Sequence, residues 1–587
     1  MKDSKELRKE IATLPVTESI IVAAGPGSGK TKLLIDRLVY LCKHTIRPNS
    51  NIACITYTNA AKDEILERLQ KENEFSLPQG TFIGTIHSFL NEYLIAPYSY
   101  LLSQVGQTYE LLPRGFSKYY VNSISDSRKF KIPDNVIALE SIGYDKTGDL
   151  ICFRSNKITK GEMSILKKMI HDDHKIDQQD TIYFAFQLLS KFPHLKAALT
   201  SRFSAILVDE YQDVTYYQDQ IFQLLNATSF FFVGDPNQSI FSFTGAEPTI
   251  FESRLSNPGA FKQYTLTNNF RSTTAIVDFN NKKATFKQLP NGSNVGIQQD
   301  VILLMDKADI KQAVEAFHEL RIKVGSEQEH IPFLILSRKH EKLTEIQHKI
   351  NGHEIEQAPF LNKLKEIDYR RYEIVNQLLR AVLLNKSQEY GKSIEAIELA
   401  LARIIFNKNP NFINLSEIKY DRMVWRKLQV GVFAWINAQE FNVMTIDSFF
   451  KALKGHLKDF SEKRLGIKIG IKLKSLDYDW PSQKRDIKKI TVQQVMNQII
   501  LDPNEAERAY LTTIHSAKGR EATSILVIAE DLKELERWLK INDKEEARVG
   551  FVAFTRARRF LCVWCPGLTE FGEGSLGVPG FKWAHLG

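Results

Sequence analysis

The sequence predicts an α/β fold made of two lobes, each built on a mostly parallel sheet. Short continuous apolar runs recur far apart in the chain, which is typical of strands that are covered on both faces. Helical patterns follow several of these runs, as in doubly wound sheets. The runs are IIVAA (20–24), ILVD (206–209), FFFVGD (230–235), FLIL (333–336) and ILVIA (525–529).

The distribution of these runs predicts the domain organisation. The chain has 587 residues, more than the roughly 250–300 residues that a single compact core supports. Strand-like runs fall into two groups, and the long stretches between the members of each group have helical patterns instead. We expect a first lobe from 1–91 and 195–265, a mainly helical insertion at 92–194, a second lobe from 266–350 and 505–587, and a second helical insertion at 351–504.

Helices are expected after the first apolar run and within the second insertion. KLLIDRLVYLC (32–42) has one apolar face, and EIVNQLLRAVLL (373–384) is a further helical pattern. The apolar face of the first helix consists of Leu33, Leu34, Leu38 and Leu41. The Gly- and Pro-rich tail at 566–587 is expected to be loosely ordered.

Composition excludes a largely disordered chain. Hydrophobic residues make up 43% of the chain and charged residues 25%, which is an ordinary globular composition. The 78 Lys and Arg against 69 Asp and Glu give a net charge of +9. This mild basic bias is compatible with a polyanionic partner but does not establish one.

Cysteine usage and hydropathy predict a soluble cytoplasmic protein without a membrane partner. The five cysteines are too scattered for a disulfide framework. Cys562 and Cys565 lie in a strand-like segment, FLCVWC (560–565), so buried thiols are favoured over a metal site. No apolar run reaches the roughly 18–20 residues that span a bilayer, and no signal-peptide pattern follows the charged N-terminus.

The clearest local signal is a phosphate-binding loop between a strand and a helix. The string AGPGSGKT (24–31) follows the first apolar run directly. Glycines let the backbone wrap a triphosphate, with N–H groups and a helix N-terminus facing the anion. Lys30 would contact the β- and γ-phosphates, and Thr31 would offer its hydroxyl to Mg²⁺. The candidate nucleotide-binding residues are Ala24, Gly25, Pro26, Gly27, Ser28, Gly29, Lys30 and Thr31.

A pair of carboxylates follows the second apolar run, in ILVDEYQD (206–213). We expect Asp209 to hold Mg²⁺ through its water shell. Glu210 is expected to polarise the attacking water as the general base. An acidic helix N-cap is the alternative interpretation, and the phosphate loop upstream makes it much less favoured.

An ordered set of further motifs extends over most of the chain. Together with VGDPNQSIFSFTGAEP (233–248), they resemble the motifs of the UvrD/Rep/PcrA-type superfamily-one DNA helicases. Chance agreement of so many motifs in the right order is negligible. The further motifs are ITYTNAAKDEILERL (55–69), GTIHSFL (84–90), LTNNFRST (266–273), LTTIHSAKGRE (511–521) and EEARVGFVAFTRAR (545–558).

The resemblance implies two RecA-like lobes that bind ATP between them, each with a helical insertion. By position, Gln238 would sense the γ-phosphate, and Arg271 and Arg556 would reach it from the second lobe. A guanidinium that arrives when the lobes close stabilises the charge that spreads over the γ-oxygens, which couples hydrolysis to closure. Glu521 would contact the ribose. The candidate catalytic residues are therefore Lys30, Glu210, Gln238, Arg271 and Arg556.

The resemblance also implies a track for single-stranded DNA, where aromatic faces stack on bases and polar groups contact the backbone. The candidate aromatic residues are Tyr57, Phe241 and Phe243, and the candidate polar contacts are Thr56, Asn59 and His87. Core packing is the alternative role of an isolated Phe. The family commonly has Tyr-Gly-Trp-Arg-Gly where this chain has Phe-Ser-Phe-Thr-Gly, which reduces the stacking area and removes one arginine.

Two other departures from the family concern the recognition of the adenine base and the length of the insertions. The family usually has a glutamine upstream of the phosphate loop that recognises adenine, whereas the first glutamine here is Gln70. Both insertions look shorter than in processive members. Residues 451–489, within the second insertion, contain 12 Lys or Arg and five Asp or Glu. A duplex-binding patch and a solvated or protein-docking face remain open for this segment.

Two functional hypotheses follow. The first is an ATP-dependent translocase or helicase that moves 3′ to 5′ on single-stranded or tailed duplex DNA. The string SFTGAEP (242–248) and the reduced insertions are also similar to the helicase-like subunit of Gabija anti-phage systems. The second hypothesis is therefore a nucleotide- and DNA-sensing subunit that regulates a partner nuclease-ATPase in a defence complex.

Overall fold

The computed structural model describes most of the chain, in separate ranges. These are 4–44, 50–71, 76–102, 109–112, 141–154, 158–225, 229–257, 259, 261–297, 301–304, 309–323, 333–339, 342–343, 345–346, 369–386, 390–406, 422–439, 444–465, 490–496, 511–539, 544–567 and 581–584. Two compact units emerge, one from 1–353 with 510–587 and the other from 354–509.

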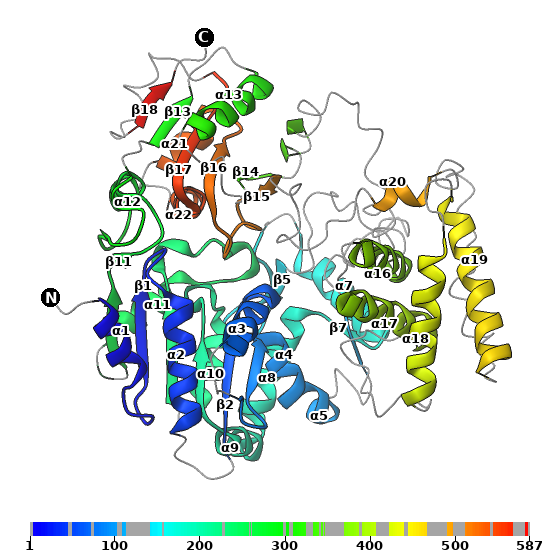
Figure 1. Cartoon of the computed structure of the whole chain (residues 1–587). Coiled ribbons are helices and arrows are strands. Elements are labelled where there is room, and N and C mark those ends of the chain that lie inside the picture. The colour runs from blue at the N-terminus through cyan, green and yellow to red at the C-terminus, as the bar shows by residue number, and fades with distance from the viewer. Residues whose placement is uncertain are drawn as a thin grey trace. The chain divides into compact units, whose positions relative to one another are not determined.

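The first lobe is built on a six-stranded parallel sheet (Figure 1). Its inner strands are mostly apolar and almost wholly buried because helices cover both faces, which confirms the predicted sheet. In spatial order the strands are β10 (Lys262–Leu266), β1 (Ile20–Ala24), β9 (Ser229–Gly234), β8 (Phe203–Val208), β2 (Asn51–Thr56) and β3 (Phe82–Thr85). The helices beside it include α1 (Ser4–Ala12), α2 (Lys30–Lys43), α3 (Asn59–Lys71), α10 (Tyr216–Leu224) and α11 (Pro248–Ser256).

Helix α2 forms as expected, with its leucines inside the sheet's core. Arg37 on this helix ties α1 and the following turn to the lobe. Its guanidinium donates to the carbonyls of Ala12 at 3.2 Å and Pro15 at 3.0 Å, and also to that of Leu14. Burial lowers the pKa of Arg37 to about 10. The N-terminal helix α1 is therefore fixed against the helix that follows the phosphate loop.

Helices predominate in the chain between β3 and β8, but two short strand pairs are also present. The helices are α4 (Ile86–Leu90), α5 (Ala96–Tyr98), α7 (Lys160–Asp172), α8 (Gln178–Lys191) and α9 (Pro193–Arg202). The pairs join β4 (Glu110–Leu111) to β7 (Lys175–Ile176) and β5 (Ile142–Tyr144) to β6 (Leu150–Cys152). Helix α8 packs within the same apolar core as the first sheet.

The second lobe contains another six-stranded parallel sheet. Cys562 and Cys565 are buried in or beside its strand β17, as predicted. The strands in order are β15 (Leu511–Thr513), β14 (Leu334–Ser337), β16 (Ala522–Ile528), β17 (Ala557–Trp564), β13 (Val301–Leu304) and β18 (Phe581–Ala584). Its helices include α12 (Thr274–Asn281), α13 (Ile310–Lys323), α21 (Leu532–Leu539) and α22 (Lys544–Phe554), and β11 (Asn268–Asn269) pairs with β12 (Leu289–Pro290).

The expectation of a loosely ordered tail is wrong for its last described segment. Phe581–Ala584 forms strand β18, which pairs in parallel with β13. The segment FKWA alternates apolar and polar residues, and the edge of β13 offers unpaired backbone groups. A short strand at the sheet edge therefore forms despite the glycines that precede it.

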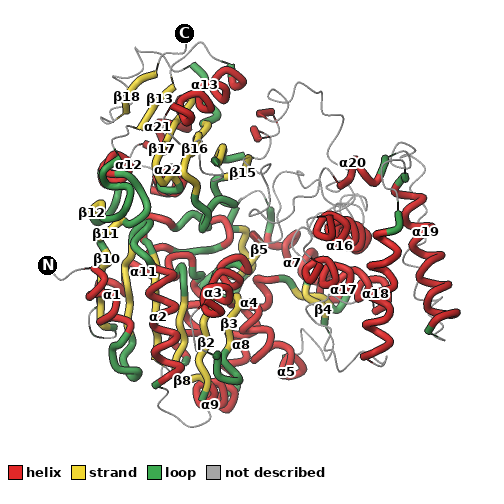
Figure 2. The backbone as a smooth tube through the Cα atoms, in the orientation of Figure 1, coloured by secondary structure: helices red, strands yellow, loops and turns green. Residues whose placement is uncertain are grey.

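The second unit is mainly helical in its described residues, which also include an antiparallel bridge between Thr445 and Thr491 (Figure 2). Its own apolar core is formed by the facing sides of these helices. They are α16 (Tyr369–Lys386), α17 (Tyr390–Phe406), α18 (Arg422–Asn437), α19 (Ile446–Asp459) and α20 (Val492–Met496). Within the described part of the chain, no helix is both long and apolar enough to span a bilayer.

A buried ionic cluster fixes the start of α8. Lys167 on α7 is 4% exposed, and its Nζ donates to Asp177 at 2.5 Å and to Asp180 at 2.8 Å. The Tyr144 hydroxyl donates to Asp180 at 2.7 Å, and His171 Nε2 lies 3.1 Å from the same carboxylate. Asp177 and Asp180 also form a capping box on α8. The cation therefore holds together two helices and a hairpin.

We expect Lys167→Met to destabilise the first lobe by about 3–5 kcal/mol, because it leaves two buried carboxylates without their counter-ion. Urea unfolding followed by tyrosine and tryptophan fluorescence measures the change. Lys160→Met is the matched control, because Lys160 lies on the same helix but its ion pair with Asp149 is exposed. This substitution should have no measurable effect on stability. An unchanged midpoint for Lys167→Met would show that the cluster contributes nothing to stability.

Candidate functional site

The phosphate loop begins where β1 ends at Ala24 and ends where α2 begins at Lys30. Gly27 and Gly29 have φ angles of 65° and 88°, a left-handed backbone that favours glycine. A Cβ atom on Gly27 would lie 2.5 Å from the Cβ of Arg271, because a second-lobe segment packs directly on the loop. The loop therefore has a tight form that presents backbone N–H groups and a helix N-terminus to an anion.

Asp209 and Glu210 follow β8, two strands away from the loop in the same sheet. Glu210 has a φ of 52°, and such strained non-glycine residues cluster at functional sites. Burial and the neighbouring Glu210 raise the pKa of Asp209 to about 7. Burial would also raise the pKa of Glu210, but Lys30 and Lys518 outweigh it and lower this pKa to about 2. Glu210 is therefore ionised at neutral pH, as a base requires.

Gln238 lies after β9, 2% exposed, and connects the two lobes. Its Nε2 donates to Asp235 Oδ2 at 2.5 Å, and the Nζ of Lys30 lies 3.9 Å from that same oxygen. Its Oε1 accepts a hydrogen bond of 2.8 Å from Nη2 of Arg556 in the second lobe. A single amide therefore links the phosphate-loop lysine to the arginine that follows α22.

Arg556 is buried at the seam between the lobes. Its Nε donates to the carbonyl of Val552 at 3.0 Å, and its Nη1 donates to that of Arg520 at 3.3 Å. Burial and the nearby Arg271 lower the pKa of Arg556 to about 9, so the group still carries its charge at neutral pH. These hydrogen bonds fix the guanidinium of Arg556 in a position where it faces the first lobe.

Arg271 and Glu521 form an ion pair in the second lobe, and Glu521 also pairs with Arg558. The Nη1 of Arg271 donates to the carbonyl of Thr555 at 3.3 Å. The two sequence-predicted arginines, Arg271 and Arg556, therefore lie on the same wall of the seam. Glu521, predicted to contact a ribose, is here bound by two guanidinium groups, and its ribose contact stays a prediction.

The donor groups fit a magnesium nucleotide. Asp209 and Glu210 place two carboxylates side by side, and the raised pKa of Asp209 reflects a charge that a nearby cation would stabilise. Thr31 sits in the first turn of α2, where its hydroxyl can join that site. Among the described residues, no cluster of three or more His, Cys, Asp or Glu could hold a metal by itself. Mg²⁺ would therefore rely on Thr31 and Asp209 together with phosphate oxygens and water.

Three of the predicted DNA-binding residues form one aromatic cluster. Tyr57 stacks on Phe241 with ring centroids 4.8 Å apart, and Phe243 lies 6.0 Å from Phe241. His515 from the second lobe meets the Phe243 ring edge-on at 5.5 Å. The Nζ of Lys518 lies 4.9 Å from the centre of the Phe241 ring. Stacking faces and a cation are therefore concentrated at one place.

The predicted polar contacts differ in exposure. Thr56 is 1% exposed, and its hydroxyl donates to the carbonyls of Thr58 at 3.0 Å and Gly84 at 3.4 Å. Asn59 is exposed at the start of α3, and His87 is half-buried on α4. The hydroxyl of Thr56 is therefore committed to the fold in this conformation, and the DNA contact of all three residues stays a prediction.

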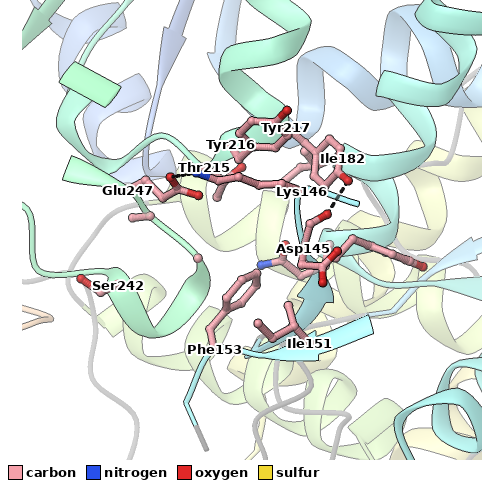
Figure 3. A pocket seen from close by; sticks show the side chains of 14 residues that line it. Asp145, Lys146, Ile151, Phe153, Ile182, Thr215, Tyr216, Tyr217, Ser242 and Glu247 are labelled. Atoms are coloured by element: carbon pink, nitrogen blue, oxygen red, sulfur yellow. Dashed lines mark hydrogen bonds and ion pairs between the residues drawn. The ribbon is translucent and has the colours of Figure 1, made fainter. Parts of the chain in front are cut away.

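A pocket of about 350 Å³ lies between the β5–β6 hairpin and the turn at 241–245, here called the aromatic turn (Figure 3). Phe153 points into this pocket from the hairpin side. Gln179 at the start of α8 donates to the carbonyl of Thr244 at 3.0 Å. Lys146 in the hairpin pairs with Glu247 at 2.9 Å. The hairpin and α8 therefore support the turn that contains Phe241 and Phe243.

Sequence reasoning did not single out Lys518, His515 and Gln212. Lys518 donates to the carbonyl of Gln238 at 2.7 Å and pairs with Asp213. The side chain of Gln212 accepts from the N–H of Asp235 at 2.9 Å and donates to Glu210. All three lie inside motifs that the sequence revealed, so the signal was present, but their side-chain roles depend on contacts between distant segments.

The basic segment 451–489 is described only as far as Leu465. Within that part, Lys451 pairs with Asp447 and Lys463 pairs with Asp459, both on exposed helix faces. Residues 466–489 lie outside the described residues. Both interpretations of this segment therefore remain open.

Burial and the cation Arg338 lower the pKa of His515 to about 4, against an unfolded value near 6.5. The unfolded chain therefore binds this proton first as the pH falls, and stability is lost between about pH 6.5 and 4. Over this pH range, we expect the free energy of unfolding of wild type to fall by about 3 kcal/mol more than that of His515→Phe. Urea unfolding at each pH measures the difference, and parallel pH profiles for the two proteins would contradict it.

Comparison with known proteins agrees with this geometry. Residues 4–258 match the family described as the UvrD/REP helicase N-terminal domain. The chain is 24% identical to the ATP-dependent DNA helicase Rep of Buchnera aphidicola (subsp. Acyrthosiphon pisum), over 94% of this chain and 93% of that protein. It is 26% identical to the Gabija protein GajB of Bacillus cereus (strain VD045), over 93% and 92%.

A third relative is the putative ATP-dependent DNA helicase YjcD of Bacillus subtilis (strain 168), which is 24% identical over 94% of this chain and 78% of that protein. The family match begins before the phosphate loop, and these three relatives each cover more than nine-tenths of the chain. Residues 4–258 thus match the UvrD/REP helicase N-terminal domain, and the resemblance of the chain to the UvrD/Rep-type DNA helicases is confirmed.

Proposed function

We propose that this protein hydrolyses ATP between its two lobes and uses the resulting closure to move 3′ to 5′ on single-stranded DNA, or to unwind a tailed duplex. The observation that carries this proposal is the hydrogen bond between Gln238 in the first lobe and Arg556 in the second. It joins groups that bind a triphosphate from opposite sides. Opening or closing the seam therefore changes the charge that surrounds the γ-phosphate.

Each residue between the two lobes would have a separate role in ATP hydrolysis. Lys30 neutralises the β- and γ-phosphates, and Asp209 with Thr31 holds the magnesium ion that the nucleotide brings. Ionised Glu210 orients the attacking water and accepts its proton. Arg271 and Arg556 stabilise the charge that develops on the γ-oxygens in the transition state. ATP and Mg²⁺ are the expected ligands because the relatives described above include ATP-dependent helicases.

Lys518 supports a direct coupling between the nucleotide and the DNA. Its Nζ donates to the carbonyl of Gln238 and pairs with Asp213, which adjoins the acidic motif. The same Nζ lies over the ring of Phe241. A change at the γ-phosphate that moves Gln238 therefore also moves a cation that touches the aromatic cluster. This short connection gives hydrolysis a route to the DNA track.

The decisive experiment combines an ATPase assay with an unwinding assay. We expect single-stranded DNA to stimulate ATP hydrolysis many-fold, and a duplex with a 3′ tail to be unwound while a 5′-tailed duplex is not. Glu210→Gln should bind ATP and stop turnover, which provides the inactive control. An ATPase that is indifferent to DNA would overturn the motor proposal.

Arg556→Ala should lower the turnover of ATP by roughly 10³-fold or more, because an arginine of this type acts mainly on the transition state. The affinity for ATP should change much less. Steady-state hydrolysis and equilibrium binding of a fluorescent ATP analogue separate the two effects. Lys311→Ala is the control, since Lys311 is exposed on α13. An equal loss in binding and turnover would contradict the assigned role.

Phe243→Ala should weaken binding of an oligothymidine by about 1–3 kcal/mol, the value of one stacked base. Fluorescence anisotropy in low salt measures this affinity. Tyr100→Ala removes an aromatic ring that is 58% exposed elsewhere on the first lobe and should have no effect. If the two variants bind alike, Phe243 is a packing residue rather than a stacking platform.

The relative from the Gabija system favours a second candidate function. The match covers more than nine-tenths of both proteins, and the aromatic turn has lost the arginine expected of a strong motor. In this alternative, the chain senses nucleotide and DNA and regulates a partner nuclease-ATPase in a defence complex. Co-purification with a nuclease encoded by a neighbouring gene, with no unwinding by the isolated chain, would favour it over the motor.

A further inference from the structure

Helices α18 and α19 lie side by side in the second unit (Figure 1). A groove of about 880 Å³ opens between α18 and the end of α19. The two elements approach closely there, since a Cβ atom on Gly431 would lie 2.5 Å from the ring of Phe460. At Phe460 the α-helix changes to a π-helical turn, Phe460–Arg464. Turns of this kind are rare and occur frequently at functional sites, so this groove is a candidate binding surface.

The floor of the groove is aromatic and apolar. Its half-buried lining residues are His456, Phe460 and Leu465. The imidazole of His456 is stacked between the rings of Trp435 and Phe460, with centroid distances of 5.5 and 5.6 Å. Its Nε2 lies 3.1 Å from the carbonyl of Gly431, which can only accept a hydrogen bond, so this nitrogen donates. Burial lowers the pKa of His456, and the ring is therefore neutral at neutral pH.

An exposed valine extends this apolar lining. Val430 on α18 faces the same groove and is 58% exposed. A single exposed apolar side chain is ordinary, but Val430 shares the groove with Phe460 and Leu465. Apolar side chains of a partner would therefore gain free energy by removing this lining from water.

The rim of the groove is strongly basic. Arg426 and Lys427 line it from α18. Lys463 and Arg464 line it from the π-helical turn. All four side chains are exposed. The described lining residues include one carboxylate, that of Asp459, which lies 3.4 Å from Nζ of Lys463. Cations therefore stand on both sides of an apolar floor and outnumber the carboxylate.

This combination fits a protein segment better than a DNA duplex. A duplex is held mainly through its phosphate oxygens, which gain nothing from an apolar floor and which Asp459 would repel. An amphipathic helix, in contrast, lays its apolar face into a groove of this kind. Carboxylates on both sides of that apolar face would pair with the cations of the two walls. The lining and the charge are thus complementary to an acidic helix.

We propose that this groove binds an acidic amphipathic helix of a partner protein, with leucine or aromatic side chains against Val430 and Phe460 and carboxylates beside the four cations of the rim. The groove consists of residues of the second unit alone. The proposal therefore depends neither on the nucleotide site nor on the proposed function. It assigns the basic segment to protein docking as far as Leu465, where its described part ends.

Three fluorescein-labelled synthetic peptides of equal length test the proposal by fluorescence anisotropy with the full chain. The first has a helical face of leucine and phenylalanine, with glutamate at its other positions. The second has serine in place of the apolar face, and the third has lysine in place of glutamate. The first should bind roughly 10-fold or more tightly than the others, because it alone complements both lining and charge. Equal binding of the three peptides, or no binding of the first, would overturn the proposal.

Two groove variants locate the binding site. Val430→Glu should weaken binding of the first peptide by roughly 10-fold or more, because it places a carboxylate in the apolar lining. Arg464→Glu should weaken this binding more at low salt than at high salt, since exposed charges are screened. Both positions are exposed, so the fold should persist, which circular dichroism checks. If neither variant weakens binding, the peptide does not occupy the groove and the assignment is wrong.

Ile165→Glu and Lys392→Glu are the matched controls. Ile165 is an apolar side chain on α7 that is 40% exposed, and Lys392 is an exposed cation on α17. Both lie outside the groove. Each control makes the same change of charge as its groove variant, and each should leave the affinity for the first peptide unchanged.

Two other occupants would give different results. Val430→Ser should weaken the acidic peptide by roughly 3-fold or more, because apolar contact is lost. If a short DNA duplex is the ligand instead, Arg464→Glu should weaken its binding, Val430→Ser should not, and the peptide should not compete with it. If a second copy of the chain covers the groove, light scattering should show a dimer that Val430→Glu dissociates. Either of these last two results would overturn the proposal.

Discussion

The structure depends on one small contact between its lobes, the amide of Gln238. It is held by Asp235 on one side and by Arg556 on the other, with Lys30 beside Asp235. A buried amide has both donor and acceptor groups to satisfy, and leaving either unpaired would cost free energy. Because its partners come from different lobes, the amide can be fully satisfied only when the lobes meet in one arrangement. The hydrogen bonds of this amide therefore depend on whether the two lobes are in this arrangement.

Around this contact, each charge is balanced by a group from another segment. Glu210 stays ionised because Lys30 and Lys518 outweigh its burial, and Lys518 itself is held by Asp213. Glu521 balances Arg271 and Arg558. Such a network is costly when it is only partly satisfied. A nucleotide that replaces some of these partners therefore alters the whole seam rather than one residue, which is the behaviour needed to couple binding to movement.

Much of the fold was predictable because its signals are local. The apolar runs became the parallel strands β1, β8, β9, β14 and β16, and the glycine-rich loop lies between β1 and α2 as its spacing required. The contacts of His515 and Lys518 were not predictable, since each depends on how segments hundreds of residues apart approach one another. The tail was misjudged for the same reason. Its glycines suggested disorder, but the free edge of β13 orders Phe581–Ala584.

The order of strands along the chain has a consequence for biosynthesis. All six strands of the first sheet are present once Leu266 has left the ribosome. In the second sheet, β13 and β14 are made early, but every strand that pairs with them begins at Leu511 or later. Their apolar side chains and their backbone hydrogen-bonding groups have no strand partner while the helical unit between them and their partners is translated. Chaperone demand during synthesis should therefore fall on this lobe rather than on the one that contains the phosphate loop.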